Sequence, residues 1–311
     1  MKINVLRSDE IYKQVMACPP EEKTEMYRQE MLAPFMKKWE IQQIPYRARE
    51  ENGFDAMTIN NMAHLSPEMI TPDMEPAVEQ ISSDILWDEL KKTLEHCLHL
   101  FTQHGISLPV SEYLFTILLG SPDNELLRLT EGYSGEGGIP GYIFLSLIPN
   151  DYTRKRLKPA LAHECNHNVR YQFIKWNDTI NLGELIVSEG LAENFATSLY
   201  GEDLMGPWVS KTDAHTLNNV IKPIIKEHLE ITGLPHIMAY LYGDDVAKIQ
   251  GLPIAGGVPH SAGYVCGYYL VKYYLQKTGK SIVEATTLPA DDILREVEEY
   301  WDEETETVLH R

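Results

Sequence analysis

The 311-residue sequence has no long apolar run and is short of basic side chains. No stretch approaches the roughly 20 apolar residues that a membrane-spanning helix needs. The first ten residues lack the apolar core of a signal peptide. With 27 Lys and Arg against 46 Asp and Glu, the formal net charge is −19, which argues against binding to a phosphate backbone. We therefore expect no nucleic-acid partner and no membrane partner.

Cysteine is scarce and dispersed. The four cysteines stand singly in the sequence, and no two of them form a Cys-x-x-Cys pair. Such spacing favours a disulfide-free protein, and we expect a cytoplasmic location. The hydrophobic content of 43% and charged content of 23% are ordinary for a globular protein, and the length allows one large domain or two.

Residues 160–170 contain the pattern His163-Glu164-x-x-His167. Residues four apart lie one above the other on a helix, so both imidazoles can reach one ion. Glu164 would lie beside that ion, where a carboxylate can take a proton from metal-bound water. Pro159 is tolerated only near a helix start, which places that start close to residues 153–158. On the motif alone, two helix-face histidines with a surface glutamate between them remain an alternative.

The predicted helix at residues 181–196 carries two acids, Glu189 and Glu193, on an otherwise apolar stripe. Carboxylates one turn apart repel each other and lose hydration when buried, so they need a compensating cation. A zinc ion held by His163 and His167 would supply one for Glu189, and the N–H of a ligand imidazole would suit Glu193. We therefore predict one zinc ion per chain, ligated by His163, His167 and Glu189, with Glu193 supporting a ligand histidine.

The pattern resembles the gluzincin metallopeptidases and, more widely, the YjaZ-like predicted zinc-dependent peptidases. The resemblance covers about residues 110–280 and rests on the His-Glu-x-x-His motif, on residues 188–193 and on Gly263-Tyr264-x-x-Gly267-Tyr268-Tyr269-Leu270-Val271. In gluzincins, a Glu on the next helix is the third ligand and an acid four positions later supports a ligand histidine. These positions are Glu189 and Glu193 here, although the gluzincin pattern often has Asp at the second. The resemblance also implies that an edge strand, at residues 138–145, pairs with an extended substrate.

The fold expected is α+β and mostly helical, with a gluzincin-like core in which a small sheet lies beside the motif helix. Residues 1–75 form an N-terminal segment of helices and irregular chain, and residues 76–311 form the catalytic domain. Short apolar runs predict strands at residues 113–119 and 142–148, and another strand with its turn at residues 123–133. A long amphipathic helix is expected from about residue 75 to residue 104.

The chemistry expected is that of a zinc-dependent metallopeptidase acting on a peptide or protein substrate, with Glu164 as general base. Negative charge on the carbonyl oxygen calls for a further donor, for which Tyr264 and His260 are candidates. Tyr264 matches the family pattern and His260 rests on position alone, and either could instead make a structural hydrogen bond. The alternative function is a zinc-stabilised binding or regulatory protein on a peptidase scaffold, with little or no turnover. Intact Glu164 favours the enzyme, because no structural zinc site needs that carboxylate.

Overall fold

A computed structural model describes residues 1–50, 53–177 and 179–304. The packing of its elements divides the chain into two compact units. The first contains Met1–His96 and Val110–Glu164, and the second contains Cys97–Pro109 and Cys165–Arg311. The boundary predicted after residue 75 falls inside the first unit, and the separate N-terminal segment stays a prediction.

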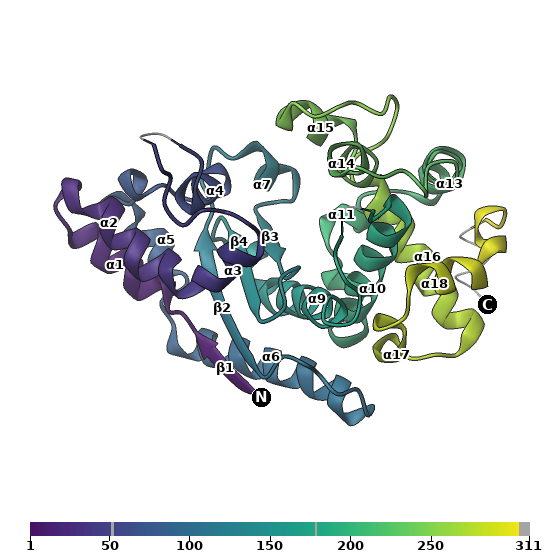
Figure 1. Cartoon of the computed structure of the whole chain (residues 1–311), viewed down its shortest axis with the longest axis horizontal. Helices are drawn as coiled ribbons and strands as arrows, with labels where there is room; N and C mark the ends of the chain where they lie inside the picture. Colours follow the sequence, from purple (N-terminus) through teal and green to yellow (C-terminus); the bar gives the residue numbers. More distant parts are fainter. Residues whose placement is uncertain (51–52, 178, 305–311) are drawn as a thin grey trace. The chain divides into compact units, whose positions relative to one another are not determined.

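The first unit is built on a four-stranded sheet in the order β1-β2-β4-β3 (Figure 1). Its strands are β1 (Lys2–Val5), β2 (Glu112–Leu119), β3 (Tyr133–Glu136) and β4 (Tyr142–Leu147). β2 pairs in parallel with β1 and β4, whereas β3 pairs antiparallel with β4. β2 and β4 are rich in buried branched and aromatic residues, which suits central strands. The strands predicted at residues 113–119 and 142–148 are therefore confirmed, and β3 is an edge strand.

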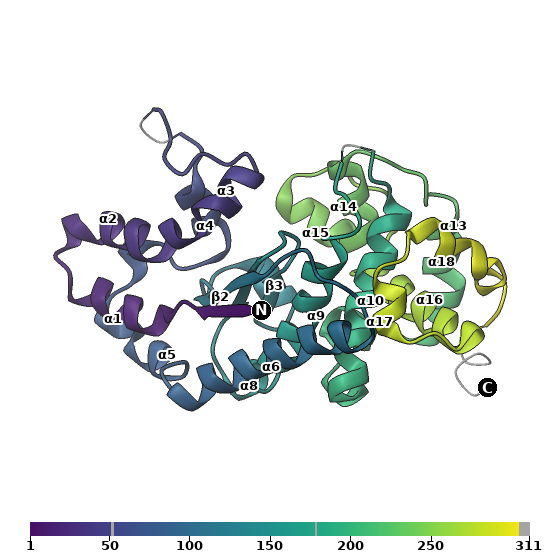
Figure 2. The same ribbon diagram turned by 60° about the horizontal axis from the view of Figure 1, so that its bottom comes forward.

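Helices cover both faces of this sheet (Figures 1 and 2). On one face, the rings of Phe35 and Trp39 lie 4.5 Å and 5.8 Å from the ring of Phe144. On the other face, Trp87 packs 6.3 Å from Phe115. The helices are α1 (Ser8–Ala17), α2 (Lys23–Tyr27), α3 (Met36–Ile41), α4 (Ala56–Ala63), α5 (Glu75–Glu79), α6 (Asp84–Gln103), α7 (Glu125–Leu129), α8 (Asp151–Lys155) and α9 (Leu157–Arg170), of which α6 and α9 continue into the second unit.

The second unit is built around α10 (Leu182–Tyr200), whose residues from Leu182 to Ala196 are nearly all buried. Helix α16 (Ala262–Thr278) crosses it so closely that a Cβ atom on Gly190 or on Gly267 would overlap the backbone of the other helix. The sequence predicted an apolar stripe on α10, but the packing buries the helix on all sides. The other helices are α11 (Pro207–Ser210), α12 (Ala214–Thr216), α13 (Lys222–Lys226), α14 (Leu234–Tyr242), α15 (Asp244–Gln250), α17 (Ile282–Thr286) and α18 (Ala290–Glu296).

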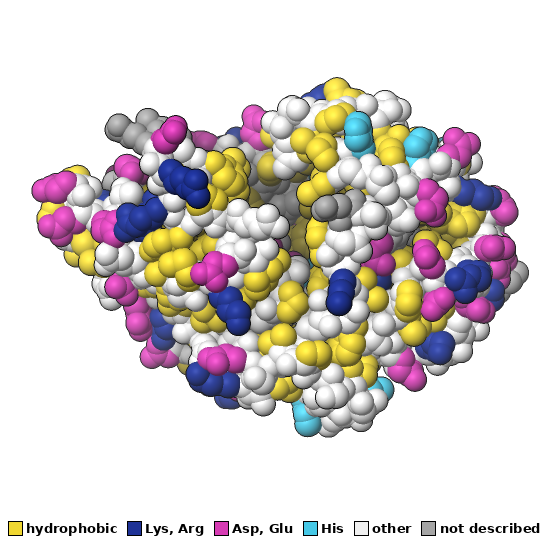
Figure 3. All heavy atoms as spheres, viewed as in Figure 1, with side chains coloured by type: hydrophobic (Ala, Val, Ile, Leu, Met, Phe, Trp, Pro, Cys, Tyr) yellow, Lys and Arg dark blue, Asp and Glu magenta, His cyan; other side chains and the backbone are white. Residues whose placement is uncertain are grey.

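Single turns of 3-10 or π helix complete both units. They are Pro20–Glu22, Arg28–Leu32, Ala33–Phe35, Pro67–Met69, Pro72–Met74, Glu202–Leu204, Leu217–Ile221 and Glu298–Trp301. The mostly helical α+β class is therefore confirmed. Among the described residues, no helix is both long enough and apolar enough to cross a membrane. Acidic and basic side chains are interspersed over the face in Figure 3.

Three expectations about local structure were wrong. The N-terminal segment contains more than the predicted helices and irregular chain, because β1 adds a strand beside β2; a four-residue run is too short to show a period. The helix expected from residue 75 to residue 104 is broken into α5 and α6 at a Ser-Ser pair, where the hydroxyl of Ser83 accepts a hydrogen bond from Leu86 N–H. Residues 125–129 form α7, capped by Asn124, and only Tyr133 begins a strand.

The edge strand also differs from the prediction. β4 (Tyr142–Leu147) covers the second half of residues 138–145 but lies between β2 and β3, so both its sides are paired. Strand order depends on contacts between distant segments, which local spacing does not encode. The edge of the sheet next to β4 is formed by β3, just before the predicted range, and β1 forms the other edge.

Candidate metal centre

Helix α9 carries the His-Glu-x-x-His motif and begins at Leu157, inside the predicted range, with Pro159 in its first turn. The residues His163, Glu164 and His167 are all buried, with exposed fractions of 4%, 6% and 7%. Helix α10 brings Glu189 to the two histidines. His163, His167 and Glu189 each offer one ligand atom, and these atoms lie within 4.8 Å of one another.

The donor set of this cluster fits a zinc ion. His167 Nε2 lies 3.2 Å from Glu189 Oε2. Two ligands held about 2 Å from a tetrahedral ion are about 3.3 Å apart, so this pair already has a suitable spacing. Two imidazoles and one carboxylate are typical of a catalytic site, which keeps a fourth position open. The Glu189 carboxylate, with a side chain only 14% exposed, also benefits from a nearby cation.

Two residues without a role predicted from the sequence hold His167 in place. Its Nδ1 lies 3.1 Å from the Ser188 hydroxyl, which lies 3.0 Å from the Tyr171 hydroxyl. The Tyr171 ring is also nearly parallel to the imidazole. Burial raises the pKa of Tyr171, so its hydroxyl stays neutral and can donate. Tyr171 follows His167 by four residues, and this helical spacing was the available signal; nothing in the sequence indicated where Ser188 points.

Glu164 lies directly against strand β3. A Cβ atom on Gly135 would overlap the Glu164 side chain, and one on Gly137 would overlap its carbonyl group. Only glycine allows a strand to come this close to the helix. These glycines therefore let the backbone at residues 135–137 come close to the motif helix.

Glu193 is 3% exposed and accepts two hydrogen bonds from the chain after α10. Its Oε1 accepts from Gly206 N–H at 2.7 Å, and its Oε2 accepts from the Trp208 indole at 2.9 Å. These donors stabilise a buried carboxylate. The predicted hydrogen bond from a ligand histidine to Glu193 stays a prediction.

The two candidate transition-state donors lie at the start of α16. His260 Nδ1 lies 2.9 Å from Asp245 Oδ2, at the beginning of α15, and the His260 side chain is 27% exposed. Tyr264 lies in the first turn of α16, with its ring 6.2 Å from Trp208 and 5.5 Å from Tyr242. Trp208 also donates to Glu193, so Tyr264 and Glu193 share a neighbour. The catalytic roles of both candidates stay predictions.

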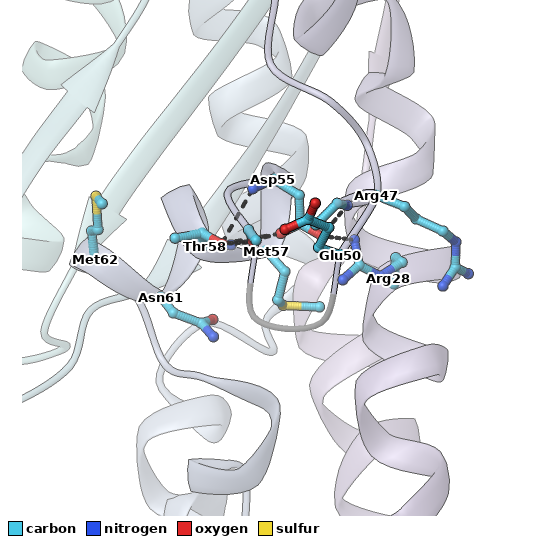
Figure 4. A pocket seen from close by; sticks show the side chains of 10 residues that line it. Arg28, Arg47, Glu50, Asp55, Met57, Thr58, Asn61 and Met62 are labelled. Carbon is cyan, nitrogen blue, oxygen red and sulfur yellow. Dashed lines mark hydrogen bonds and ion pairs between the residues drawn. The ribbon is translucent and has the colours of Figure 1, made fainter.

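A pocket of about 600 Å³ lies among the N-terminal helices of the first unit (Figure 4). Both of its arginines and its aspartate already have partners. Arg28 forms a 2.9 Å ion pair with Asp55, whose carboxylate also caps α4 through Thr58 N–H. Arg47 pairs with Glu25. Among the described residues, the grouping of histidines and carboxylates that could hold a metal lies on α9 and α10 and not in this pocket.

Comparison with known proteins agrees with a candidate zinc site in this chain. Residues 86–295, more than half of the chain, match the family described as "Predicted Zn-dependent protease (DUF2268)". The chain belongs to this family. It is also 30% identical, over 295 residues, to the uncharacterized protein YjfC of Bacillus subtilis (strain 168), an alignment that covers 94% of this chain and 97% of the relative. No solved structure matches the chain significantly, so the gluzincin form of the core stays a prediction.

Proposed function

We propose that this member of the predicted zinc-dependent protease family is a metallopeptidase that hydrolyses peptide bonds. One observation carries the proposal: the ligand atoms of His163, His167 and Glu189 lie within 4.8 Å of one another, beside the buried Glu164. These three residues would hold one zinc ion. When bound, zinc supplies Lewis acidity and lowers the pKa of water at its open position to around 7.

Glu164 is the general base in this proposal. A carboxylate in the middle of the motif helix takes the proton of the attacking water and later delivers it to the leaving amine. Its burial between α9 and β3 keeps bulk water from competing for the carboxylate. A structural zinc site would have no use for such a group, which supports turnover over a purely structural role.

Strand β3 is the proposed binding edge for an extended peptide. It forms one edge of the sheet, it runs antiparallel to β4, and its Gly135 lies against Glu164, as does Gly137 just after the strand. A peptide added to this edge would form main-chain hydrogen bonds along β3 and pass beside the general base. Recognition through the main chain would tolerate many side chains.

The proposed donor to the developing negative charge is His260, with Tyr264 as the other candidate. The contact with Asp245 supports His260, because a carboxylate that accepts from Nδ1 fixes the ring and turns Nε2 outward. Preorganised donors of this kind stabilise a transition state because they need no reorientation. Tyr264 is held by aromatic contacts and has a hydroxyl of its own to donate.

The experiment that tests the function combines metal content with turnover. The purified protein is dialysed without chelator, its zinc is measured by elemental mass spectrometry, and a peptide library is then offered to the wild type and to Glu164→Gln. We expect about one zinc per chain in both proteins, and a loss of turnover of about 10²- to 10⁴-fold in the variant. Glu95→Gln, which changes an exposed carboxyl on α6 in the same way, is the matched control.

Each outcome separates the alternatives. Negligible zinc, with no uptake when zinc is offered, would refute the metallopeptidase and the zinc scaffold together. Unchanged turnover in zinc-loaded Glu164→Gln would remove Glu164 as the base. One zinc per chain without hydrolysis of any peptide would favour the zinc-stabilised binding or regulatory protein.

A further inference from the structure

The two faces of β3 meet different parts of the first unit. Gly135 faces Glu164, and the next residue, Glu136, points to the opposite face because side chains alternate along a strand. Glu136 pairs in register with Phe144 of β4. Helix α3 covers this second face and lies in front of β3 and β4 in Figure 1. The strand is therefore held between the motif helix and an N-terminal helix.

Three polar side chains join α3 and the residue after it to β3. Lys38 Nζ lies 2.8 Å from Glu136 Oε1, and the amide of Gln42 donates to the same oxygen at 2.9 Å. Lys38 Nζ also donates to Gln42 Oε1 at 2.8 Å. The contacts form a closed triangle, which fixes the position of Glu136 better than a single hydrogen bond would.

Lys38 is almost completely buried, with 1% of its side chain exposed. Its ammonium group lies 4.2 Å from the ring centroid of Trp39 and 4.6 Å from that of Phe144. Burial lowers the pKa of Lys38, and the charge of Glu136 opposes this shift. A buried ammonium needs an anionic partner, so α3 is strongly favoured in a position that reaches Glu136.

A second contact of the N-terminal segment lies on the same face of the sheet. His64, just after α4, has its Nε2 2.6 Å from the hydroxyl of Ser146 on β4. Ser146 is paired in register with Ser134 of β3. The N-terminal segment therefore contacts the sheet at both ends of the short edge strand.

We propose that the N-terminal segment positions β3 against Glu164, with Lys38 and Gln42 as positioning residues that act through Glu136. The inference rests on the proposed function, in which a peptide pairs with β3. A strand that shifts relative to Glu164 would carry a bound peptide with it. The N-terminal segment thus contributes to substrate binding without supplying a group that touches the reacting atoms.

The test compares Glu136→Gln, Lys38→Met and the double variant with wild type, each as the zinc-loaded full chain. The double variant removes both charges, so it leaves no unpaired ammonium and separates lost stability from lost positioning. Glu112→Gln is the matched control, because Glu112 pairs with Lys2 on the same sheet but at the start of β2. Hydrogen exchange of residues 133–136 is measured first, and KM and kcat for a hydrolysed peptide follow.

We expect exchange in β3 to become at least roughly tenfold faster in Glu136→Gln and in the double variant, with α10 and the zinc content unchanged. KM should rise about five- to tenfold while kcat stays within about twofold. Unchanged exchange in β3, or faster exchange with an unchanged KM, would overturn the positioning role. If the wild type hydrolyses no peptide, the proposed function fails by itself, and the exchange rates still decide whether α3 holds β3.

Discussion

On α9 and α10 the candidate zinc ligands lie among buried side chains, whereas His260 follows a largely exposed loop at residues 251–259. His167 is held by a pair of hydroxyls, those of the buried Ser188 and the half-buried Tyr171. The loop before His260 is held by carboxylates of α15. Asp244 accepts four backbone N–H groups, from residues 255 to 258, and Asp245 contacts His260 itself.

The two regions are held by different interactions: side-chain packing holds the proposed ligands, and charged hydrogen bonds hold the proposed donor. We refer to this as a division of tasks between packing and charge. Helix packing fixes the proposed ligands before any metal arrives, which lowers the cost of ordering them. Hydrogen bonds to two neighbouring aspartates fix the proposed transition-state donor, in a part of the chain that can move more easily. Substitutions in the first region should therefore change metal affinity, and substitutions in the second should change turnover while zinc is retained.

The largest effect is expected when a proposed zinc ligand in the first region is removed. Glu189→Ala should reduce zinc affinity by more than the 10- to 100-fold typical of residues that only support a ligand, because a coordinating atom is lost. Zinc occupancy after dialysis against a weak chelator measures this effect, and the exposed Glu227→Ala is the control. Full occupancy in Glu189→Ala would exclude Glu189 from the ligand set.

The second region is tested at His260. His260→Ala should lower kcat by about 10²- to 10³-fold, the usual effect of losing one transition-state donor, with zinc content unchanged. Asp245→Asn should cause a smaller loss, because the ring remains but its orientation is less fixed. His236→Ala, an exposed histidine on α14, controls for the substitution. Loss of zinc from His260→Ala would contradict the division of tasks, and unchanged turnover would leave Tyr264 as the candidate donor.

Removing either of the two hydroxyls next to His167, those of Ser188 and Tyr171, should reduce zinc affinity by an intermediate amount. Ser188→Ala removes the acceptor at Nδ1, and such supporting residues commonly contribute about 10- to 100-fold in metal affinity. Tyr171→Phe should reduce zinc affinity less, because the Tyr171 hydroxyl contacts the imidazole through Ser188 and the ring is kept. Competition with a chromogenic chelator gives both affinities. Equal zinc affinity in Ser188→Ala and wild type would mean that packing alone orients His167.

The parts of the site that the sequence could predict are those set by helical spacing. His163 and His167 share a helix face because they are four residues apart, and Glu189 follows on the next helix. The structure brings all three together. The start of α9 was also predictable from a single residue, because Pro159 is tolerated only near a helix start.

The remaining features depend on contacts between segments far apart in the chain. The contact of Lys38 with Glu136 joins residues almost 100 positions apart, and neither residue is unusual in its local sequence. Strand order has the same origin, which is why β4 rather than β3 was expected at the edge. Asp245 and His260 are 15 residues apart across a loop without periodicity, so their pairing was visible only after folding.

The smallest expected effect concerns Asp244. Burial alone would raise the pKa of this carboxyl, but the four N–H donors lower it overall, below the ordinary value of 3.8. Its contribution to stability is therefore complete above pH 3.8 and is lost as pH falls through the lower folded-state value. Asp244→Asn should unfold more easily than wild type at pH 7, and this difference in the free energy of unfolding should shrink as pH falls below 3.8.

Urea unfolding of both proteins measures this difference. The metal is removed first, so that zinc release does not add to the change of the unfolding free energy with pH. Asp203→Asn, an exposed aspartate after α10, is the control. In zinc-loaded protein at pH 7, Asp244→Asn should also speed hydrogen exchange at residues 255–258 while zinc occupancy stays at the wild-type level. A stability difference that does not change with pH would mean that the charge of Asp244 does not hold the loop. Loss of zinc would show that the loop and the buried cluster are coupled, which contradicts their separate means of support.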